Sequence, residues 1–381
     1  MKIAIGIPSY KEADNIGFVT TQADRGLTIS KDLFPKFKEG VIFNIDSESN
    51  DGTQKIFNKT KTTWPKYSIT VRGSPGKGKN LIAFFKKIIN KDFDVVLTID
   101  SDLKTIEPNW VVKFIEPFIK GKCDFVVPLY ERNRFEGSTT NHFAYPLIYS
   151  FFGKNIRQPI AGDFALSKRL VQYILKKKAP RQAKRYGIDI FLTIEAIRFG
   201  GYIRQIKLAQ KIHKQSFPKL KIMFPQIASS ALDLIRTVNF KKIPPAENQD
   251  NTICINKDTH FLHRKQAGAL LKKQKIGLVS KLNRIYWLGD IKEKISKNLN
   301  NNNFYFDENI WAEILSSWFS FFIDHKDEDS FNCANQLSPF FVFRTVNFWN
   351  KVMNYNSQEV ESEIRSQAQL IRKKIITKLI N

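Results

Sequence analysis

Short apolar runs alternate with amphipathic segments through the first half of the chain, and this alternation restricts the possible folds most strongly. The apolar runs predict strands at residues 3–7, 41–45, 68–71, 95–99 and 125–127. The amphipathic segments predict helices at residues 15–25, 52–61, 79–89 and 110–119. Strands that alternate with helices are typical of a parallel, doubly wound α/β sheet. Polar residues follow several of these strands, at the edge where open α/β sheets bind ligands.

The pattern changes near residue 221, after which helical periodicity dominates. Helices are predicted at residues 227–238, 259–273, 311–323 and 340–355, and residues 362–380 form a basic amphipathic ending. We therefore expect two domains, an α/β domain of residues 1–220 and a helical region of residues 221–381. The aromatic helices of that region could supply an interface for a homo-oligomer.

The chain is strongly basic. It has 61 Lys and Arg residues against 36 Asp and Glu residues, a formal net charge of +25. Such an excess favours acidic partners such as nucleic acid, anionic lipid, phosphates or carboxylates, without choosing among them. No nucleic-acid-binding motif is recognisable, so no nucleic-acid partner is expected. The basic runs at residues 176–178 and 372–374 are interpreted as solvated helix faces.

The cysteines indicate a reducing compartment. Cys123, Cys254 and Cys333 lie far apart, and their spacing does not match a zinc site. The first apolar run is followed closely by charged residues, which is unlike a signal peptide. The longest apolar stretches are shorter than the roughly 20 residues that cross a bilayer. We expect a cytoplasmic protein.

An Asp-Ser-Asp sequence, Asp100-Ser101-Asp102, follows the strand predicted at residues 95–99. Two carboxylates one residue apart can face a common divalent ion, and their oxygen ligands suit Mg²⁺ or Mn²⁺. The alternative is that one aspartate caps the following segment.

A glycine-rich segment, Gly76-Lys77-Gly78, precedes a predicted helix. Glycines beside a lysine allow backbone N–H groups to approach a phosphate at a helix N-terminus. The spacing is not that of a Walker A sequence, and a plain Gly-Pro turn is the alternative.

Two further loops follow the first two predicted strands. Tyr10 and Glu12 offer an aromatic face and a carboxylate suited to a base and a ribose. Asp46 opens an acidic turn that leads into a helix. Ordinary loop chemistry is the alternative explanation for each of these features.

Taken in order, these motifs resemble the nucleotide-binding half of a GT-A glycosyltransferase. Later segments make the chain similar to retaining enzymes of the mannosylglycerate synthase and glucosyl-3-phosphoglycerate synthase type. These segments are Pro108-Asn-Trp110, Arg157-Gln-Pro159, Ala161-Gly-Asp163, Tyr186-Gly-Ile-Asp189 and Lys211-Ile-His213. The resemblance covers roughly residues 3–220.

The resemblance implies a nucleotide-sugar site and a divalent metal ion, Mg²⁺ or Mn²⁺. The donor-binding residues that it implies are Pro8, Tyr10, Glu12, Asp46, Gly76, Lys77, Gly78, Asp100 and Ser101. The implied metal ligands are Asp100, Asp102 and His213, the last from a loop that folds over the donor.

The resemblance also implies an acceptor site. Its residues are Tyr130, Arg132, Thr139, Thr140 and Asn141. Asp189 is the candidate to orient the acceptor hydroxyl or to take its proton, and a helix cap is its alternative role. Asp163 stands where this family usually has Glu, which puts its sugar or acceptor contact in doubt and leaves a nucleophilic role conceivable.

The leading hypothesis is retaining transfer of a hexose from GDP-mannose or from UDP- or GDP-glucose to D-glycerate or 3-phosphoglycerate. A second hypothesis is transfer to a lipid or polysaccharide acceptor, with residues 362–380 lying on an anionic membrane. A third is a non-enzymatic, basic nucleic-acid-binding protein. The sequence does not choose the base, the sugar, the acceptor or the oligomeric state.

Overall fold

The computed structural model describes residues 1–214, 220–239, 242–248, 255–256, 275, 278–280, 282–300 and 306–380. The chain divides into two compact units. Unit 1 comprises Met1–Tyr130 and Gln158–Leu220, and unit 2 comprises Glu131–Arg157 and Lys221–Asn381. Residues 131–157 were predicted in the first domain, but they belong to unit 2.

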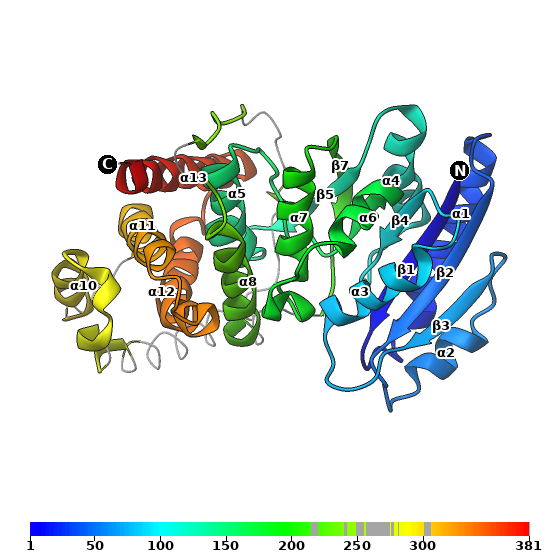
Figure 1. The fold of residues 1–381 in the computed structure, drawn as a ribbon, viewed down its shortest axis with the longest axis horizontal. Helices are drawn as coiled ribbons and strands as arrows, with labels where there is room; N and C mark the ends of the chain where they lie inside the picture. The colour runs from blue at the N-terminus through cyan, green and yellow to red at the C-terminus, as the bar shows by residue number, and fades with distance from the viewer. Residues whose placement is uncertain are drawn as a thin grey trace. The chain divides into compact units, whose positions relative to one another are not determined.

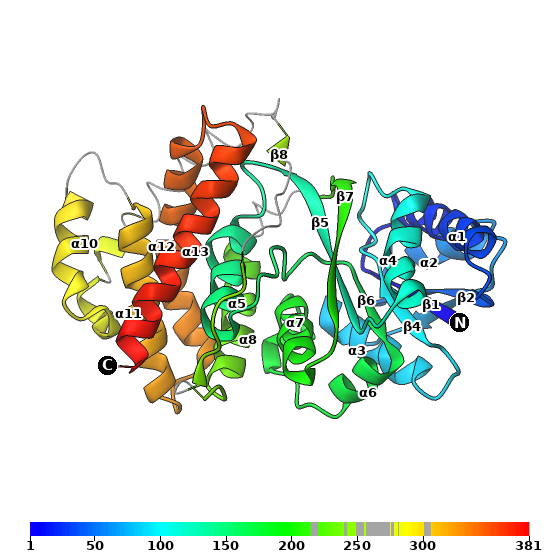
Figure 2. The same ribbon diagram turned by 90° about the horizontal axis from the view of Figure 1, so that it is seen from above.

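Packing within unit 2 explains the placement of residues 131–157. Every residue of α5 (Tyr145–Phe152) is buried. This helix lies along α13 (Ser357–Ile380), as Figure 2 shows. The side chains of Arg157 and Glu361 form a buried ion pair with an N–O distance of 3.0 Å. The core that residues 131–157 complete is therefore the core of the C-terminal helices.

Unit 1 is built on a mixed sheet with the strand order β3-β2-β1-β4-β6-β5-β7. The strands are β1 (Lys2–Ser9), β2 (Glu39–Asp46), β3 (Lys66–Thr70), β4 (Val95–Thr98), β5 (Phe125–Asn133), β6 (Phe164–Ser167) and β7 (Ile203–Gln210). The pairs β1–β2, β1–β4 and β2–β3 are parallel, whereas β6 is antiparallel to β4 and β5. The α/β class is confirmed, and the expectation of an all-parallel sheet is wrong because β6 inserts between β4 and β5.

Helices cover both faces of the sheet. They are α1 (Ile16–Leu33), α2 (Thr53–Lys59), α3 (Lys77–Ile88), α4 (Pro108–Lys120), α6 (Lys168–Leu175) and α7 (Ile188–Phe199). Figure 2 shows α1 and α4 on one face and α3, α6 and α7 on the other. Local chemistry fixes two of the starts: Pro108 occupies the first turn of α4, and the Ser167 hydroxyl accepts a hydrogen bond from the Leu170 N–H at the start of α6.

Unit 2 is mostly helical (Figure 1). Its elements are a π-helix (Thr140–Ala144), α5, α8 (Leu220–Ile235), β8 (Ile255–Asn256), two 3₁₀ turns (Leu282–Arg284 and Tyr286–Leu288), α10 (Ile291–Asn300), α11 (Glu308–Asp324), α12 (Ser330–Lys351) and α13. Stacked aromatic rings join its helices, for example Phe224 and Phe341, whose centroids lie 3.9 Å apart. The helix predicted at residues 259–273 lies outside the described residues.

The apolar face of α13 is part of the unit 2 core. Its side chains Val360, Ile364, Ala368, Ile371 and Ile375 are fully buried, and the helix packs against α5 and α11. The apolar face that the membrane hypothesis assigned to a bilayer is therefore occupied by protein. None of the helices within the described residues is long and apolar enough to cross a membrane.

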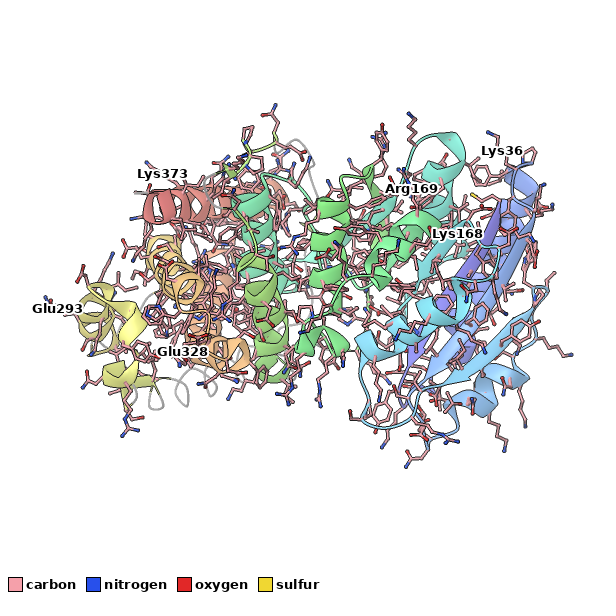
Figure 3. All side chains as sticks on the ribbon, viewed as in Figure 1. Lys36, Lys168, Arg169, Glu293, Glu328 and Lys373 are labelled. Atoms are coloured by element: carbon pink, nitrogen blue, oxygen red, sulfur yellow. The ribbon has the colours of Figure 1, made fainter. Side chains whose placement is uncertain are left out.

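The two basic runs differ in their surroundings. Lys176, Lys177 and Lys178 are exposed, as predicted, but they follow the end of α6 and do not lie on a helix face. Lys373 is also exposed on α13 (Figure 3). Arg372 departs from the prediction, because its guanidinium donates hydrogen bonds to the Tyr149 and Ser150 carbonyls at 2.7 and 2.9 Å. That side chain satisfies the last turn of α5 rather than facing solvent alone.

Candidate active site

Asp100 lies two residues after the carboxyl end of β4, the strand between β1 and β6, where the sequence predicted a ligand site. One carboxylate oxygen lies 2.6 Å from the ammonium nitrogen of Lys77, and the other lies 3.1 Å from that of Lys211. The Asp100 backbone N–H donates a hydrogen bond to the Asp163 carboxylate at 2.6 Å. Asp100 at the strand end, the two lysines and Asp163 thus form one cluster, in which Lys211 and Asp163 are buried and Lys77 and Asp100 are partly exposed.

Lys77, the first residue of α3, directs its ammonium group into this cluster. Its nitrogen lies 2.8 Å from the Gly162 carbonyl oxygen, 2.6 Å from Asp100 and 3.3 Å from Asp189. Burial alone would lower the pKa of Lys77, but the carboxylates of Asp100 and Asp189 outweigh burial and raise it. The lysine predicted to contact a diphosphate is therefore held, in this structure, by carboxylates.

The flanking glycines have a role that the sequence did not predict. The Gly78 N–H donates to the Arg185 carbonyl at 3.1 Å, so it is not directed at a phosphate. A Cβ atom at Gly78 would overlap the Ala183 carbonyl oxygen, and one at Gly76 would lie 2.5 Å from the Lys184 carbonyl oxygen. Both glycines permit close backbone packing, and that packing positions Lys77.

Lys211 was not among the predicted site residues, although it begins the Lys211-Ile-His213 segment. Only 3% of Lys211 is exposed. Its ammonium group lies 2.7 Å from Asp163 and 2.8 Å from the Ala161 carbonyl oxygen, and above the Tyr130 ring at 4.9 Å from the centroid. The signal available in the sequence was a lysine at the end of a strand, two residues before the selected histidine.

Asp163 is fully engaged by neighbouring groups. One carboxylate oxygen accepts from the Asp100 N–H, and the other accepts from the Tyr130 hydroxyl and from Lys211. Asp163 is 1% exposed and Tyr130 is fully buried. Tyr130 was predicted to bind the acceptor, but in this structure its hydroxyl donates a hydrogen bond to Asp163. A nucleophilic role for Asp163 would require breaking these contacts.

The cluster has opposite effects on the pKa values of its carboxylates. Burial alone would raise the pKa of Asp100, but Lys77 and Lys211 outweigh burial and hold that pKa well below its usual range. Burial raises the pKa of Asp102, and the negative charge of Asp100 raises it further. Burial also raises the pKa of Asp189, although Lys77 opposes the shift. For Asp102 and Asp189, the nearby lysines thus do not fully offset the effect of burial on the pKa.

Asp189 lies in the first turn of α7 and is 9% exposed. Within the described residues no side chain caps the start of this helix, whose N-cap is Gly187. The Asp189 carboxylate lies near the Lys77 ammonium group instead. The geometry therefore does not support the alternative role as a helix cap.

The residues present fit a divalent cation at Asp102. The carboxylates of Asp100, Asp102, Asp163 and Asp189 outnumber the ammonium groups of Lys77 and Lys211, which leaves two negative formal charges. Asp102 forms no hydrogen bond or ion pair with another described residue. A divalent cation would balance the charge and satisfy these oxygen ligands.

His213 does not join the two aspartates in this structure. Across the described ranges, no group of three His, Cys, Asp or Glu side chains is placed to hold a metal ion. The Nδ1 atom of His213 lies 2.7 Å from the Lys214 carbonyl oxygen. The three residues predicted to hold the metal are therefore not brought together among the described residues, and Lys211 pairs with Asp100 instead.

The loops after β1 and β2 surround a region with an exposed ring. Tyr10 is 42% exposed, as stacking on a base requires. The Glu12 carboxylate lies 2.6 Å from Lys214, and burial raises its pKa in spite of that lysine. Lys11 and Glu48 have positive φ values of 56° and 51°, a strained conformation that is frequent at functional sites.

Three other predicted donor residues are buried or partly buried in the frame of the site. Asp46 is 2% exposed and accepts hydrogen bonds from the Ser9 hydroxyl and the Ser49 N–H, at 3.1 and 2.8 Å. Pro8 is a buried residue of β1, and the Ser101 carbonyl accepts from the Asn15 side chain at 2.8 Å. These residues therefore support the conformation of the loops through contacts within the protein.

The predicted acceptor residues beyond Tyr130 belong to unit 2. Arg132 lies near the end of β5, in register with Ile255 of β8. Residues 137–144, called the acceptor loop below, contain a π-helix, an element often found at functional sites. No hydrogen bond joins the hydroxyls of Thr139 and Thr140 to another described residue. Thr139 is partly exposed, whereas Thr140 is buried, with 7% of the residue exposed.

Asn141 differs from these threonines because its amide group is already used. Its oxygen accepts from the Arg157 guanidinium at 2.9 Å, and its nitrogen donates to the Glu136 carbonyl at 3.3 Å. Asn141 is 8% exposed. Its side chain therefore holds the acceptor loop together and does not face a ligand.

Comparisons with known proteins show similarity to glycosyltransferases. Residues 4–173 match the model of Glycosyl transferase family 2. A glucosyl-3-phosphoglycerate synthase of Petrotoga mobilis is 24% identical over 290 residues, which cover 67% of this chain and 82% of that protein.

Solved structures of glucosyl-3-phosphoglycerate synthase from Mycobacterium tuberculosis have a similar fold. The complex with phosphoglyceric acid has a TM-score of 0.50 and 23% identity, over 61% of this chain and 80% of that one. The complex with Mn²⁺, UDP-glucose and phosphoglyceric acid has a TM-score of 0.50 and 21% identity, over 69% and 85%. The chain thus has an α/β, GT-A-like fold, its residues 4–173 match the model of Glycosyl transferase family 2, and it is similar to glucosyl-3-phosphoglycerate synthases.

Proposed function

We propose that the chain transfers glucose from UDP-glucose to the free hydroxyl of 3-phosphoglycerate, with retention at the anomeric carbon. The observation that carries the proposal is the cluster around Asp100 and Asp102 at the end of β4. The name of the Petrotoga mobilis relative supports the choice of sugar and acceptor. The ligands of the Mycobacterium tuberculosis complex suggest which donor to test first.

A divalent ion at Asp100 and Asp102 would supply positive charge to the departing diphosphate. We propose that these two carboxylates hold it and that His213 joins them when the donor binds. The excess negative charge of the cluster supports the proposal that these two carboxylates hold the ion. His213 lies two residues beyond Lys211, whose ammonium group contacts the Asp100 carboxylate, and this position supports the inclusion of His213 among the proposed ligands.

The two lysines would keep the site organised during transfer. Lys77 and Lys211 hold Asp100 ionised from both sides, so that it stays a ligand at neutral pH. Lys211 also fixes Asp163, whose oxygens are committed to Tyr130 and to the Asp100 backbone. The reaction we propose does not use Asp163 as a covalent nucleophile.

The acceptor hydroxyl would form the new bond to the anomeric carbon while the bond to the diphosphate breaks. Its proton would pass to Asp189 or to a phosphate oxygen of the donor. The raised pKa of Asp189 favours proton acceptance. Arg132 would bind the acceptor's carboxylate or phosphate, and the hydroxyls of Thr139 and Thr140 would bind neighbouring oxygens.

A screen of nucleotide sugars tests the proposal. Purified protein is incubated with UDP-glucose, GDP-glucose or GDP-mannose, with 3-phosphoglycerate or D-glycerate, and with Mn²⁺ or EDTA, and the products are detected by mass spectrometry. We expect glucosyl-3-phosphoglycerate with UDP-glucose and Mn²⁺. Undiminished product in EDTA would overturn the metal requirement, and mannosylglycerate as the main product would overturn the assigned donor and acceptor.

Asp102→Asn gives a second readout that is independent of turnover. Asn keeps the shape of the side chain but loses its charge, so we expect Mn²⁺ binding, measured by electron paramagnetic resonance with UDP present, to weaken at least tenfold. Glu107→Gln, on the N-cap residue of α4, is the control at an exposed carboxylate and should bind Mn²⁺ normally.

A further inference from the structure

The acceptor loop is fastened to the C-terminal helix through Asn141. The amide oxygen of Asn141 accepts from Arg157, and the Arg157 guanidinium in turn donates to Glu361 of α13. The backbone carbonyl of Asn141 accepts at 3.0 Å from the side chain of Gln367, also on α13. One residue of the loop is thus held at its side chain and at its backbone by one distant helix.

The first of these anchors is a buried ion pair. Arg157 and Glu361 are each 3% exposed, and the guanidinium meets both carboxylate oxygens, at 3.0 and 3.1 Å. The Tyr145 ring packs against Arg157 with 5.0 Å from its centroid to the guanidinium carbon. A bidentate pair of this kind fixes the guanidinium plane and therefore the direction of its bond to Asn141.

The second anchor is a fully buried amide. The Gln367 nitrogen donates to the Asn141 carbonyl, while its oxygen accepts from the Arg344 guanidinium at 2.6 Å. Arg344 belongs to α12 and is also fully buried. Since the Gln367 oxygen faces Arg344, its nitrogen is the atom directed at the Asn141 carbonyl, and both amide atoms lie 3.2 Å from Nδ1 of His142 in the same loop.

We propose that Glu361 and Gln367 are positioning residues that set the affinity for the acceptor by holding the acceptor loop in its binding conformation. The inference rests on the proposed function, because the ligand of the loop is taken to be the small acidic acceptor. Thr139 and Thr140 precede and begin the π-helix that contains Asn141, so the anchors act within two residues of these two hydroxyls. A loop that must be ordered on binding costs affinity that a pre-ordered loop does not.

Two variants separate positioning from general stability. Gln367→Glu keeps the acceptor for Arg344 and removes the donor to Asn141, and Glu361→Gln keeps the shape but removes the charge. We expect each to raise the KM for 3-phosphoglycerate about tenfold, with kcat and the KM for UDP-glucose changed less than twofold. Lys374→Gln on the same helix, which loses only its pairing with Glu313 at 3.4 Å, is the control and should leave both KM values unchanged.

Amide hydrogen exchange provides a readout that needs no substrate. In Glu361→Gln and Gln367→Glu we expect faster exchange at residues 137–144 than in the parent protein, and unchanged exchange in β1 and β2. Faster exchange in a protein that does not use 3-phosphoglycerate would contradict the proposed function and leave the anchoring intact. Unchanged exchange, or equal increases in both KM values, would overturn the inference.

A double variant tests whether Glu361 acts through Asn141. If it does, Asn141→Ala and Glu361→Gln together should raise the acceptor KM no further than Asn141→Ala alone. Additive effects would overturn this route.

Discussion

Asp189 lies in the first turn of α7, but it does not cap that helix. A capping aspartate would accept hydrogen bonds from the first N–H groups of α7, yet its carboxylate lies 3.3 Å from the Lys77 ammonium nitrogen. We expect Asp189→Asn to bind UDP with normal affinity and to unfold at the temperature of the parent, while kcat falls about 100-fold, the usual scale for a general base.

The measurement is a comparison of kcat, UDP affinity and melting temperature. A folded Asn variant with nearly normal kcat would remove Asp189 from the proton transfer and leave a donor phosphate oxygen in that role. A variant that melts much lower would instead assign Asp189 to holding Lys77.

The buried side chain of His142 should make the stability of unit 2 depend on pH. Burial lowers its pKa well below the usual value of about 6.5, and the positive charges of Arg344 and Arg157 lower it further. The folded protein therefore keeps His142 neutral, whereas the unfolded chain takes up a proton below about pH 6.5. The free energy of unfolding should fall as the pH drops through this range, by up to about 1.4 kcal/mol per pH unit for this group.

Urea unfolding at pH 7 and pH 5 checks this expectation. His142→Asn lacks the titrating ring, so its stability should depend less steeply on pH than that of the parent. The same slope in both proteins would mean that His142 is protonated in the folded state.

The sequence identified some residues of the candidate site but not the partners that hold them. Asp100 and Asp102 were identified because a strand end followed by two carboxylates is visible in the chain itself. The partners of Asp100 were not, because Lys211 reaches it across 111 residues and Asp163 across 63. Tyr130 and Asn141 were selected by their place in a motif, and only tertiary contacts show that their polar groups are already engaged.

At the element scale, the start of α3 depends on close backbone packing. A Cβ atom at Gly78 would overlap the carbonyl oxygen of Ala183 and lie 2.9 Å from the Ile188 Cβ. We expect Gly78→Ala to lower the free energy of unfolding by about 1–3 kcal/mol, the usual cost of overpacking. Activity should also fall, because Lys77 is the adjacent residue.

Gly121→Ala is the matched control for this substitution. Gly121 follows α4, has a φ of −170°, and an added Cβ would meet no atom within 4 Å. Its stability should stay within about 0.5 kcal/mol of the parent. Equal losses in the two variants, measured by chemical denaturation, would contradict the packing argument.

The elements themselves were largely predictable where their pattern was long. The parallel strands β1 and β2 are continuous apolar runs, as buried central strands require, and their predicted positions are confirmed. The four residues of β6 are too few to show a period, and they were missed. β7 was missed because its apolar residues do not alternate regularly with polar ones. These two strands make the sheet mixed.

At the scale of the whole molecule, the chain enters unit 2 at Glu131 and returns to unit 1 at Gln158. A sequence boundary drawn by pattern could find the change near residue 220 but not this earlier passage, since β5 continues as a strand to Asn133. The partners that hold residues 131–157, such as Glu361 and Gln367, lie more than 200 residues further on.

This division predicts separate responses to the two substrates. The carboxylate and lysine cluster lies wholly in unit 1, whereas the acceptor loop lies in unit 2. A ligand slows amide exchange most where it stabilises local structure. UDP with Mn²⁺ should therefore protect residues 8–12 and 98–103 and leave α11 and α12 unchanged, while 3-phosphoglycerate added afterwards should protect residues 137–144.

Hydrogen exchange followed by mass spectrometry measures both steps in one sample series. If UDP and Mn²⁺ alone protected the acceptor loop as strongly as the acceptor does, the assignment of the loop to acceptor binding would be wrong.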